Sequence, residues 1–136
     1  MIVSLHVATG AAGGALVGSR RRAAVLGLVL HALGDRMPHQ DIGSFRFEVQ
    51  SGLAALVALA LRHGPMSPVV IGAAASSAPD LEHAFAFPRP GGRKLFPSHR
   101  LHGWHRAGGM PAWVQLLGAG AILGTLLAQK RRPSAA

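Results

Sequence analysis

The chain has 136 residues, about the length of one domain, and 49% of them are hydrophobic while only 14% are charged. It contains no cysteine, which excludes a disulfide framework, a thiolate metal site and a thiol nucleophile. Such an apolar composition also argues against intrinsic disorder. Five acidic residues stand against 14 Lys and Arg and eight His, with a formal net charge of +9.

The basic residues gather in short clusters, such as residues 20–22 and 130–132. Clusters of this kind flank the apolar helices of membrane proteins, where they meet anionic headgroups. A nucleic-acid-binding domain would instead carry a basic face within a recognisable reading module, and the sequence contains no such module. We therefore expect membrane lipids as partners and no specific nucleic acid.

Five apolar stretches follow one another along the chain, and we interpret each as a helix. Pro38 ends the second stretch and Pro68 begins the fourth, two positions that suit proline at a helix boundary. The connections are short except for residues 87–109, which are rich in Pro, Gly, Arg and His. The stretches cover approximately residues 5–18, 23–37, 48–61, 68–85 and 111–129.

This pattern predicts an all-α fold, a small bundle of about five helices, with one domain over residues 1–129 and a basic tail over residues 130–136. A spanning helix needs about 20 apolar residues, and only the fifth stretch approaches that length. Glycines recur every four residues at positions 10, 14 and 18 and at positions 120 and 124, which favours close helix contact in lipid. We expect a membrane-embedded or membrane-associated bundle, and a compact soluble bundle is the alternative.

The polar residues are expected to meet at one end of this bundle. If neighbouring stretches run in opposite directions, all five acids and seven of the eight histidines fall at the same end. Only His63 falls at the other end. The sequence therefore predicts one polar site.

Three pairs of candidate metal ligands stand three or four residues apart, a spacing that allows the two pairs on predicted helices to share a helix face. Neutral imidazole and carboxylate are ligands of zinc, manganese and iron. More than four candidates are present, so two ions are an option. The pairs are His31 with Asp35, Asp80 with His83, and His102 with His105.

Each candidate also has a purely structural interpretation. Asp80 alone could pair with Arg89, and Asp35 alone with Arg36 or Arg46. The joint occurrence of three groups favours a metal or catalytic site, because ionisable residues near a membrane are costly and are retained for function.

Several histidines fit simpler roles when taken singly. His6 is expected as a polar residue at a helix start, and His63 as an interfacial residue. His39 and His99 lie in loops, where we expect them to be solvated or to contact the metal ligands without binding the metal themselves.

These motifs resemble those of the membrane-bound metal-dependent hydrolases, small bacterial inner-membrane proteins of which some are described as LexA-binding. That family combines an early Thr-His, a Pro-Asp-x-Asp-His segment, a His-Arg-Gly-x-Thr-His-Ser loop and a His-x-x-x-Asp helix. Here Pro79, Asp80 and His83 form a Pro-Asp-x-x-His segment, and a loop beginning at His99 reads His-Arg-Leu-His-Gly-Trp-His. The chain departs from the family in placing its His-x-x-x-Asp helix first, in having Glu82 for the second Asp, and in lacking the Thr-His-Ser ending.

The resemblance covers most of the chain through short motifs. It implies a multi-pass protein of the inner membrane, with the side of the site left open, and one or two divalent ions, zinc or manganese. His6 and Glu82 are second choices as ligands. The ligand roles that the resemblance implies fall on His31, Asp35, Asp80, His83, His102 and His105.

The first functional hypothesis is therefore a metal-dependent hydrolase. Glu82 or Asp41 would serve as general base. Arg100 and Arg106 would bind an anionic substrate, for which a phosphoester is the natural choice. The alternatives are a non-enzymatic membrane protein that binds a metal or a partner, and a purely structural bundle without bound metal.

Overall fold

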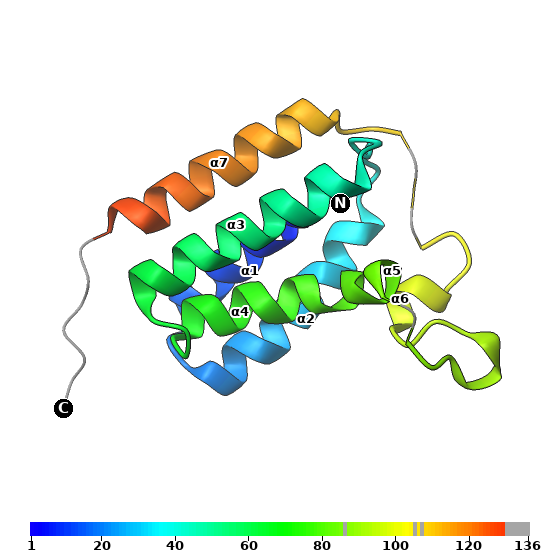
Figure 1. Cartoon of the computed structure of the whole chain (residues 1–136), viewed down its shortest axis with the longest axis horizontal. Coiled ribbons are helices and arrows are strands. Elements are labelled where there is room, and N and C mark those ends of the chain that lie inside the picture. Colours follow the sequence, from blue (N-terminus) through cyan, green and yellow to red (C-terminus); the bar gives the residue numbers. More distant parts are fainter. Residues whose placement is uncertain (86, 105, 107, 130–136) are drawn as a thin grey trace.

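The structure is a computed structural model that describes residues 1–85, 87–104, 106 and 108–129. Within these residues five helices contain ten or more residues, and no β-strand is present (Figure 1). The expected small all-helical bundle is confirmed. The long helices are α1 (Val3–Val17), α2 (Arg20–Arg36), α3 (Phe45–His63), α4 (Pro68–Ser77) and α7 (Ala112–Ala128).

The fourth predicted stretch divides into three elements: α4, a 3-10 turn η1 (Ala78–Asp80) and a short helix α5 (Leu81–Ala84). Pro79 has no N–H to continue the α-helical bonding and restricts the residue before it, so the helix tightens at this point. The long loop contains a further 3-10 turn η2 (Pro90–Gly92) and a short helix α6 (Pro97–Arg100). Elements α5 and α6 lie beside each other at one end of the bundle (Figure 1).

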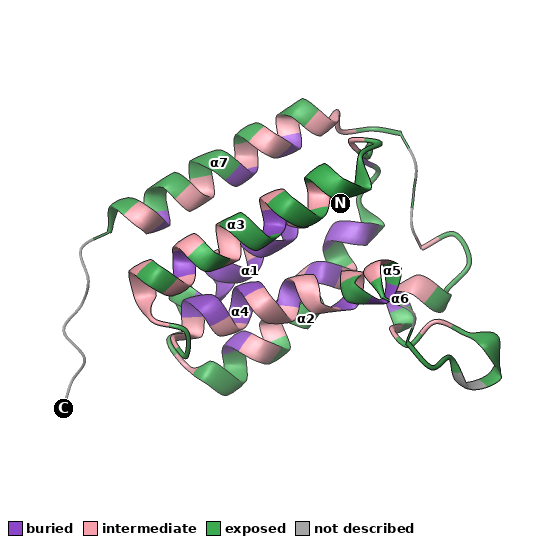
Figure 2. Cartoon of the chain, viewed as in Figure 1, coloured by how far each residue is buried: buried purple, intermediate pink, exposed green. Residues whose placement is uncertain are grey.

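Helix α1 is the centre of the bundle and packs against α2, α3, α4 and α7. Its burial is plain in Figure 2, where the outward sides of α3 and α7 are exposed. Gly10 and Gly72 allow α1 and α4 to approach closely, because a Cβ on either would collide with the carbonyl oxygen of the other. Gly14 likewise faces the Pro68 carbonyl, whereas a Cβ at Gly18 would meet nothing within 4 Å in the described part of the chain. The predicted glycine spacing on the first helix is thus used at Gly10 and Gly14.

The second glycine pair has a different outcome. A Cβ at Gly120 or Gly124 would meet open space in the described part of the chain, so this spacing makes no close helix contact there. Helix α7 is fixed instead near its start, where Gln115 accepts from the Ile2 N–H at 3.1 Å and donates to the Gln40 carbonyl at 2.8 Å.

The outward faces of the bundle are apolar. Val25, Val29 and Leu33 form an exposed apolar stripe on α2. Trp113 and Leu117 form a second exposed apolar patch on α7. No helix within residues 1–85, 87–104 and 108–129 combines the length and apolar character that a bilayer crossing requires. The expected transmembrane helices are thus not found among these residues.

Candidate metal centre

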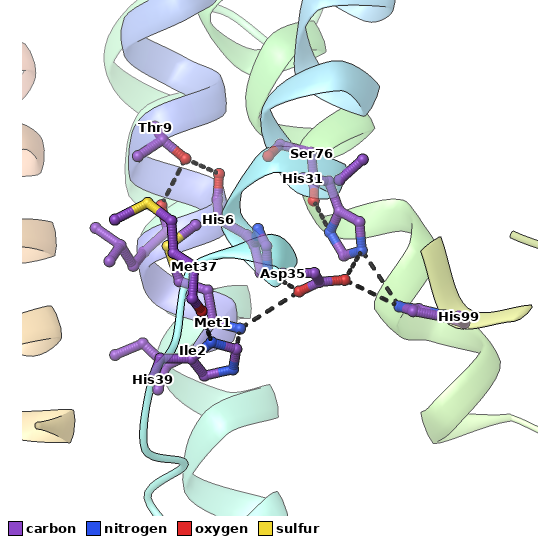
Figure 3. Close-up of polar contacts among 12 residues, drawn as sticks. Met1, Ile2, His6, Thr9, His31, Asp35, Met37, His39, Ser76 and His99 are labelled. Atoms are coloured by element: carbon purple, nitrogen blue, oxygen red, sulfur yellow. Dashed lines mark hydrogen bonds and ion pairs between the residues drawn. The ribbon is translucent and has the colours of Figure 1, made fainter. Parts of the chain in front are cut away.

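Asp35, in the last turn of α2, is the centre of a buried polar cluster (Figure 3). Its Oδ1 lies 3.2 Å from Nε2 of His6 and 3.3 Å from the amino group of Met1. Its Oδ2 lies 3.0 Å from Nε2 of His31 and 3.4 Å from Nε2 of His99. Helices α1, α2 and α6 therefore each contribute an imidazole to one carboxylate.

Hydrogen bonds on the far sides of two of these rings fix their orientation. The Nδ1–H of His31 donates to the Ser76 carbonyl at 2.8 Å. The Nδ1 of His99 is hydrogen-bonded to one carboxylate oxygen of Glu82, whose other oxygen accepts from the Leu95 N–H at 2.6 Å. Both rings consequently turn Nε2 inward, the arrangement in which a histidine is held for metal binding.

Three acceptor atoms converge between these rings. With Nδ1 protonated, a neutral imidazole carries a lone pair on Nε2. The Nε2 atoms of His31 and His99 are 3.3 Å apart, and each faces Oδ2 of Asp35. A cation, either a proton on one ring or a metal ion, is needed to satisfy the three atoms. Ligands of a tetrahedral zinc with bonds of about 2.0–2.1 Å lie roughly 3.3 Å apart, close to the separations seen here.

Two further groups adjoin this one and share Asp80. Its carboxylate comes together with His6 and His31, and also with His83 and His99, and the potential ligand atoms of each group lie within 4.8 Å of one another. The Oδ2 of Asp80 has no hydrogen-bond partner among the described residues. Burial raises the pKa of Asp80 to about 6. A poorly solvated carboxylate without a partner is the kind of group that a bound cation stabilises.

The protonation of two of the histidines, His6 and His83, favours metal binding. Burial lowers the pKa of His6 to about 3 and that of His83 to about 4, so both rings are neutral at neutral pH and need not lose a proton to become ligands. Burial also acts to lower the pKa of His99, but hydrogen bonds to Asp35 and Glu82 outweigh it and the pKa is raised. A metal ion would displace this proton.

The central carboxylate remains ionised. Burial alone would raise the pKa of Asp35, but its interactions with His31, His6 and His99 outweigh that effect and hold the pKa well below its usual range. The cluster therefore presents a permanent negative charge to the rings around it, as a cation site requires.

The structure brings together most of the ligands predicted from sequence and leaves His102 apart from them. His6, His31, Asp35, Asp80 and His83 all belong to the three groups. His102 is exposed and belongs to none of them. His105, its predicted companion, lies outside the described residues.

Glu82 and Asp41, the predicted general bases, occupy different environments. Glu82 is buried and hydrogen-bonds to His99 and Leu95, so it orients the imidazole of a candidate ligand. The Asp41 side chain is exposed and lies 3.4 Å from Nε2 of His39.

The two predicted substrate-binding arginines are exposed. The Nε–H of Arg100 donates to the Lys94 carbonyl, and the Arg106 carbonyl accepts from the His39 N–H at 3.3 Å. The structure thus gives neither guanidinium a contact with the ligand groups.

His99 is the central residue that the sequence interpretation misses. The sequence pattern places it in a loop, whereas Pro97 begins the short helix α6 and places His99 on it. Two signals point to it: the proline at the helix start, and the His-Arg pair of the family motif, which His99 and Arg100 match more closely than His102 does. The regular spacing of His102 and His105 favours that pair instead.

Comparisons of the chain with models of known protein families, with curated proteins and with solved structures gave no match. The resemblance to membrane-bound hydrolases therefore stays a prediction, and the geometry of the cluster is the basis for a functional proposal.

Proposed function

We propose that the protein is a metal-dependent hydrolase whose centre holds one or two divalent ions. The observation that carries the proposal is the convergence of His31 Nε2, His99 Nε2 and Asp35 Oδ2 at 3.0–3.4 Å. A donor set of nitrogen and carboxylate oxygen suits zinc or manganese.

The number of ions determines how the ligands divide. A single ion would bind the tight group of His31, Asp35 and His99. An imidazole nitrogen binds one ion at a time, whereas a carboxylate has two oxygens to share. Two ions would therefore use separate pairs of rings, His6 with His31 and His83 with His99, with Asp80 common to both.

A bound ion would supply an activated water at neutral pH and would polarise the scissile bond. The residues of the chain would hold the site in place for this chemistry. Ser76 and Glu82 fix the ring orientations of His31 and His99. When a single ion binds to His31, Asp35 and His99, Asp80 is better suited than Glu82 to accept a proton from water, because its Oδ2 lacks a partner among the described residues and its pKa is near 6.

The proposal includes a membrane surface as the place of action. Exposed apolar side chains recur every four residues on α3, at Val49, Leu53, Val57 and Leu61, and further exposed apolar surface lies on α2 and α7. Exposed apolar surface of this extent is typical of a lipid or protein interface. Flotation with phospholipid vesicles tests this part of the proposal, and protein that stays entirely in the lipid-free fraction contradicts it.

Metal content measured on purified protein tests the centre. We expect one or two equivalents of zinc or manganese in the parent protein and loss of this metal in His99→Ala. Asp80→Ala should lose metal where two ions share Asp80 and keep it where one ion binds His31, Asp35 and His99. His102→Ala is the matched control, since it removes an exposed histidine from the same loop. A parent protein without metal, or equal metal in all variants, overturns the proposal. Metal without turnover on a phosphoester panel supports the non-enzymatic alternative.

A further inference from the structure

A cavity of about 620 Å³ opens beside the candidate metal centre. Its volume is within the range of small-molecule sites. The walls come from α1, from the first half of α3 and from the segment that joins α4 to α5, and Asp80 and His83 line it. Because both residues also belong to the ligand groups, a molecule in the cavity would lie next to any bound ion.

The cavity is apolar over most of its surface and polar near Asp80. Val3, Val7, Val49, Leu53 and Leu56 form the apolar part. Phe45 and Phe85 also line it and are exposed, so its entrance is apolar as well. An elongated hydrocarbon chain with a polar end matches this distribution.

The charges of the lining restrict the polar end. Asp41, Glu48 and Asp80 contribute carboxylates, and no Lys or Arg is among the lining residues within the described part of the chain. Met1 also lines the cavity, but its amino group is already paired with Asp35 at 3.3 Å, so the carboxylates outnumber the cations. A free fatty acid would place its carboxylate among three others. An ester with a zwitterionic headgroup avoids that repulsion and offers its cationic group to the carboxylates.

We infer that the cavity binds the single hydrocarbon chain of a zwitterionic amphiphilic ester and directs its polar end to Asp80 and His83. This inference rests on the proposed function for the reaction, since the ester would be the hydrolysed group. The binding of the chain itself does not need the metal.

Fluorescence titration of a lysophosphatidylcholine with a pyrene-labelled acyl chain tests the inference on metal-free and metal-loaded protein. We expect saturable binding of one probe molecule per protein molecule. A probe whose acyl chain is four methylenes shorter should bind at least about tenfold more weakly. Leu53→Trp, which fills the cavity from an exposed position, should weaken binding at least about tenfold while leaving metal content unchanged.

Val57→Trp is the matched control, because Val57 is exposed on the same helix and does not line the cavity. Equal affinities of Leu53→Trp and Val57→Trp overturn the inference, as does unsaturable binding. If the cavity instead receives a second copy or a partner segment, Leu53→Trp will change the oligomeric state and not the probe affinity, which also overturns it. If the purified protein holds metal but does not bind the probe, only the inference is refuted. If it binds the probe but holds no metal, only the proposed function is refuted.

Discussion

The two ends of the bundle both carry histidine beside charged residues, yet they bind different partners. At the end where α3 and α7 finish, Arg62 donates to the Leu127 carbonyl at 2.9 Å and His63 donates to the Leu126 carbonyl at 3.1 Å. At the opposite end His31 and His99 turn Nε2 toward each other and toward Asp35.

The difference lies in what the imidazole faces. The last carbonyls of a helix lack intrahelical donors, and Arg62 and His63 donate hydrogen bonds to those of α7. At the other end the outer nitrogens are already bonded and the inner ones face acceptors, so a cation is needed from outside. The chemistry of the partner, and not the residue type, separates a structural histidine from a candidate ligand.

Asp35→Ala should have the largest effect. Its removal leaves three imidazoles without their common buried acceptor, so we expect a loss of about 3 kcal/mol in the free energy of unfolding and loss of bound metal. Denaturant titration followed by circular dichroism measures the first. The exposed Asp41→Ala is the control and should change stability by less than about 0.5 kcal/mol. Equal midpoints for both variants would contradict the central role of Asp35.

Asp80→Asn should separate stability from metal binding. Burial raises the pKa of Asp80 from 3.8 to about 6, so folding favours the protonated form. Its contribution to stability is therefore present below about pH 4 and is lost as the pH rises through about 6. We expect Asp80→Asn to stabilise the metal-free protein near neutral pH, by on the order of 2 kcal/mol, and to leave it unchanged near pH 4.

Thermal unfolding across this pH range, with and without zinc, measures both properties. If two ions share Asp80, zinc should raise the melting temperature of the parent protein more than that of Asp80→Asn, because a bound ion stabilises only the folded state that holds it. If Asp80→Asn is less stable than the parent protein at neutral pH, or if zinc stabilises both proteins equally, the interpretation of Asp80 as an unpaired carboxylate at a metal site is contradicted.

Glu82→Gln should weaken metal binding without abolishing it. Glu82 accepts from Leu95 and His99 with two different oxygens, and the NH2 group that replaces one of them in Gln cannot accept, so one of these hydrogen bonds is lost or distorted and the ring of His99 loses part of its support. Loss of such a partner typically lowers metal affinity by about 10–100-fold. Competition with a chelator measures the affinity, and Glu48→Gln serves as the control. Unchanged affinity would show that Glu82 does not position the ligand.

Arg62→Ala should have the smallest effect and leave the metal centre intact. It removes a donor from the end of α7, for which we expect about 1 kcal/mol of lost stability. The metal affinity should equal that of the parent protein. A change in affinity would mean that the two ends of the bundle are coupled.

Helix positions and the gathering of His and Asp at one end could be predicted, because both follow from local patterns: apolar stretches, proline boundaries and the spacing of His31 and Asp35. The approach of His99 to His31 could not be predicted, because the two residues are 68 positions apart and their contact depends on how an irregular loop folds against the bundle. The role of Glu82 was missed for the same reason, since its partners lie 13 and 17 positions further along the chain. The glycines of α7 matched a packing pattern but face open space, because spacing alone does not say which helix is the neighbour.

X-ray absorption at the zinc edge tests the central claim most directly. For zinc-loaded protein we predict only nitrogen and oxygen ligands at about 2.0–2.1 Å, with scattering from at least two imidazoles. The imidazole signal should fall in His99→Ala and remain unchanged in His102→Ala. Zinc that does not bind, or a spectrum that is the same in His99→Ala as in the parent protein, would contradict the account.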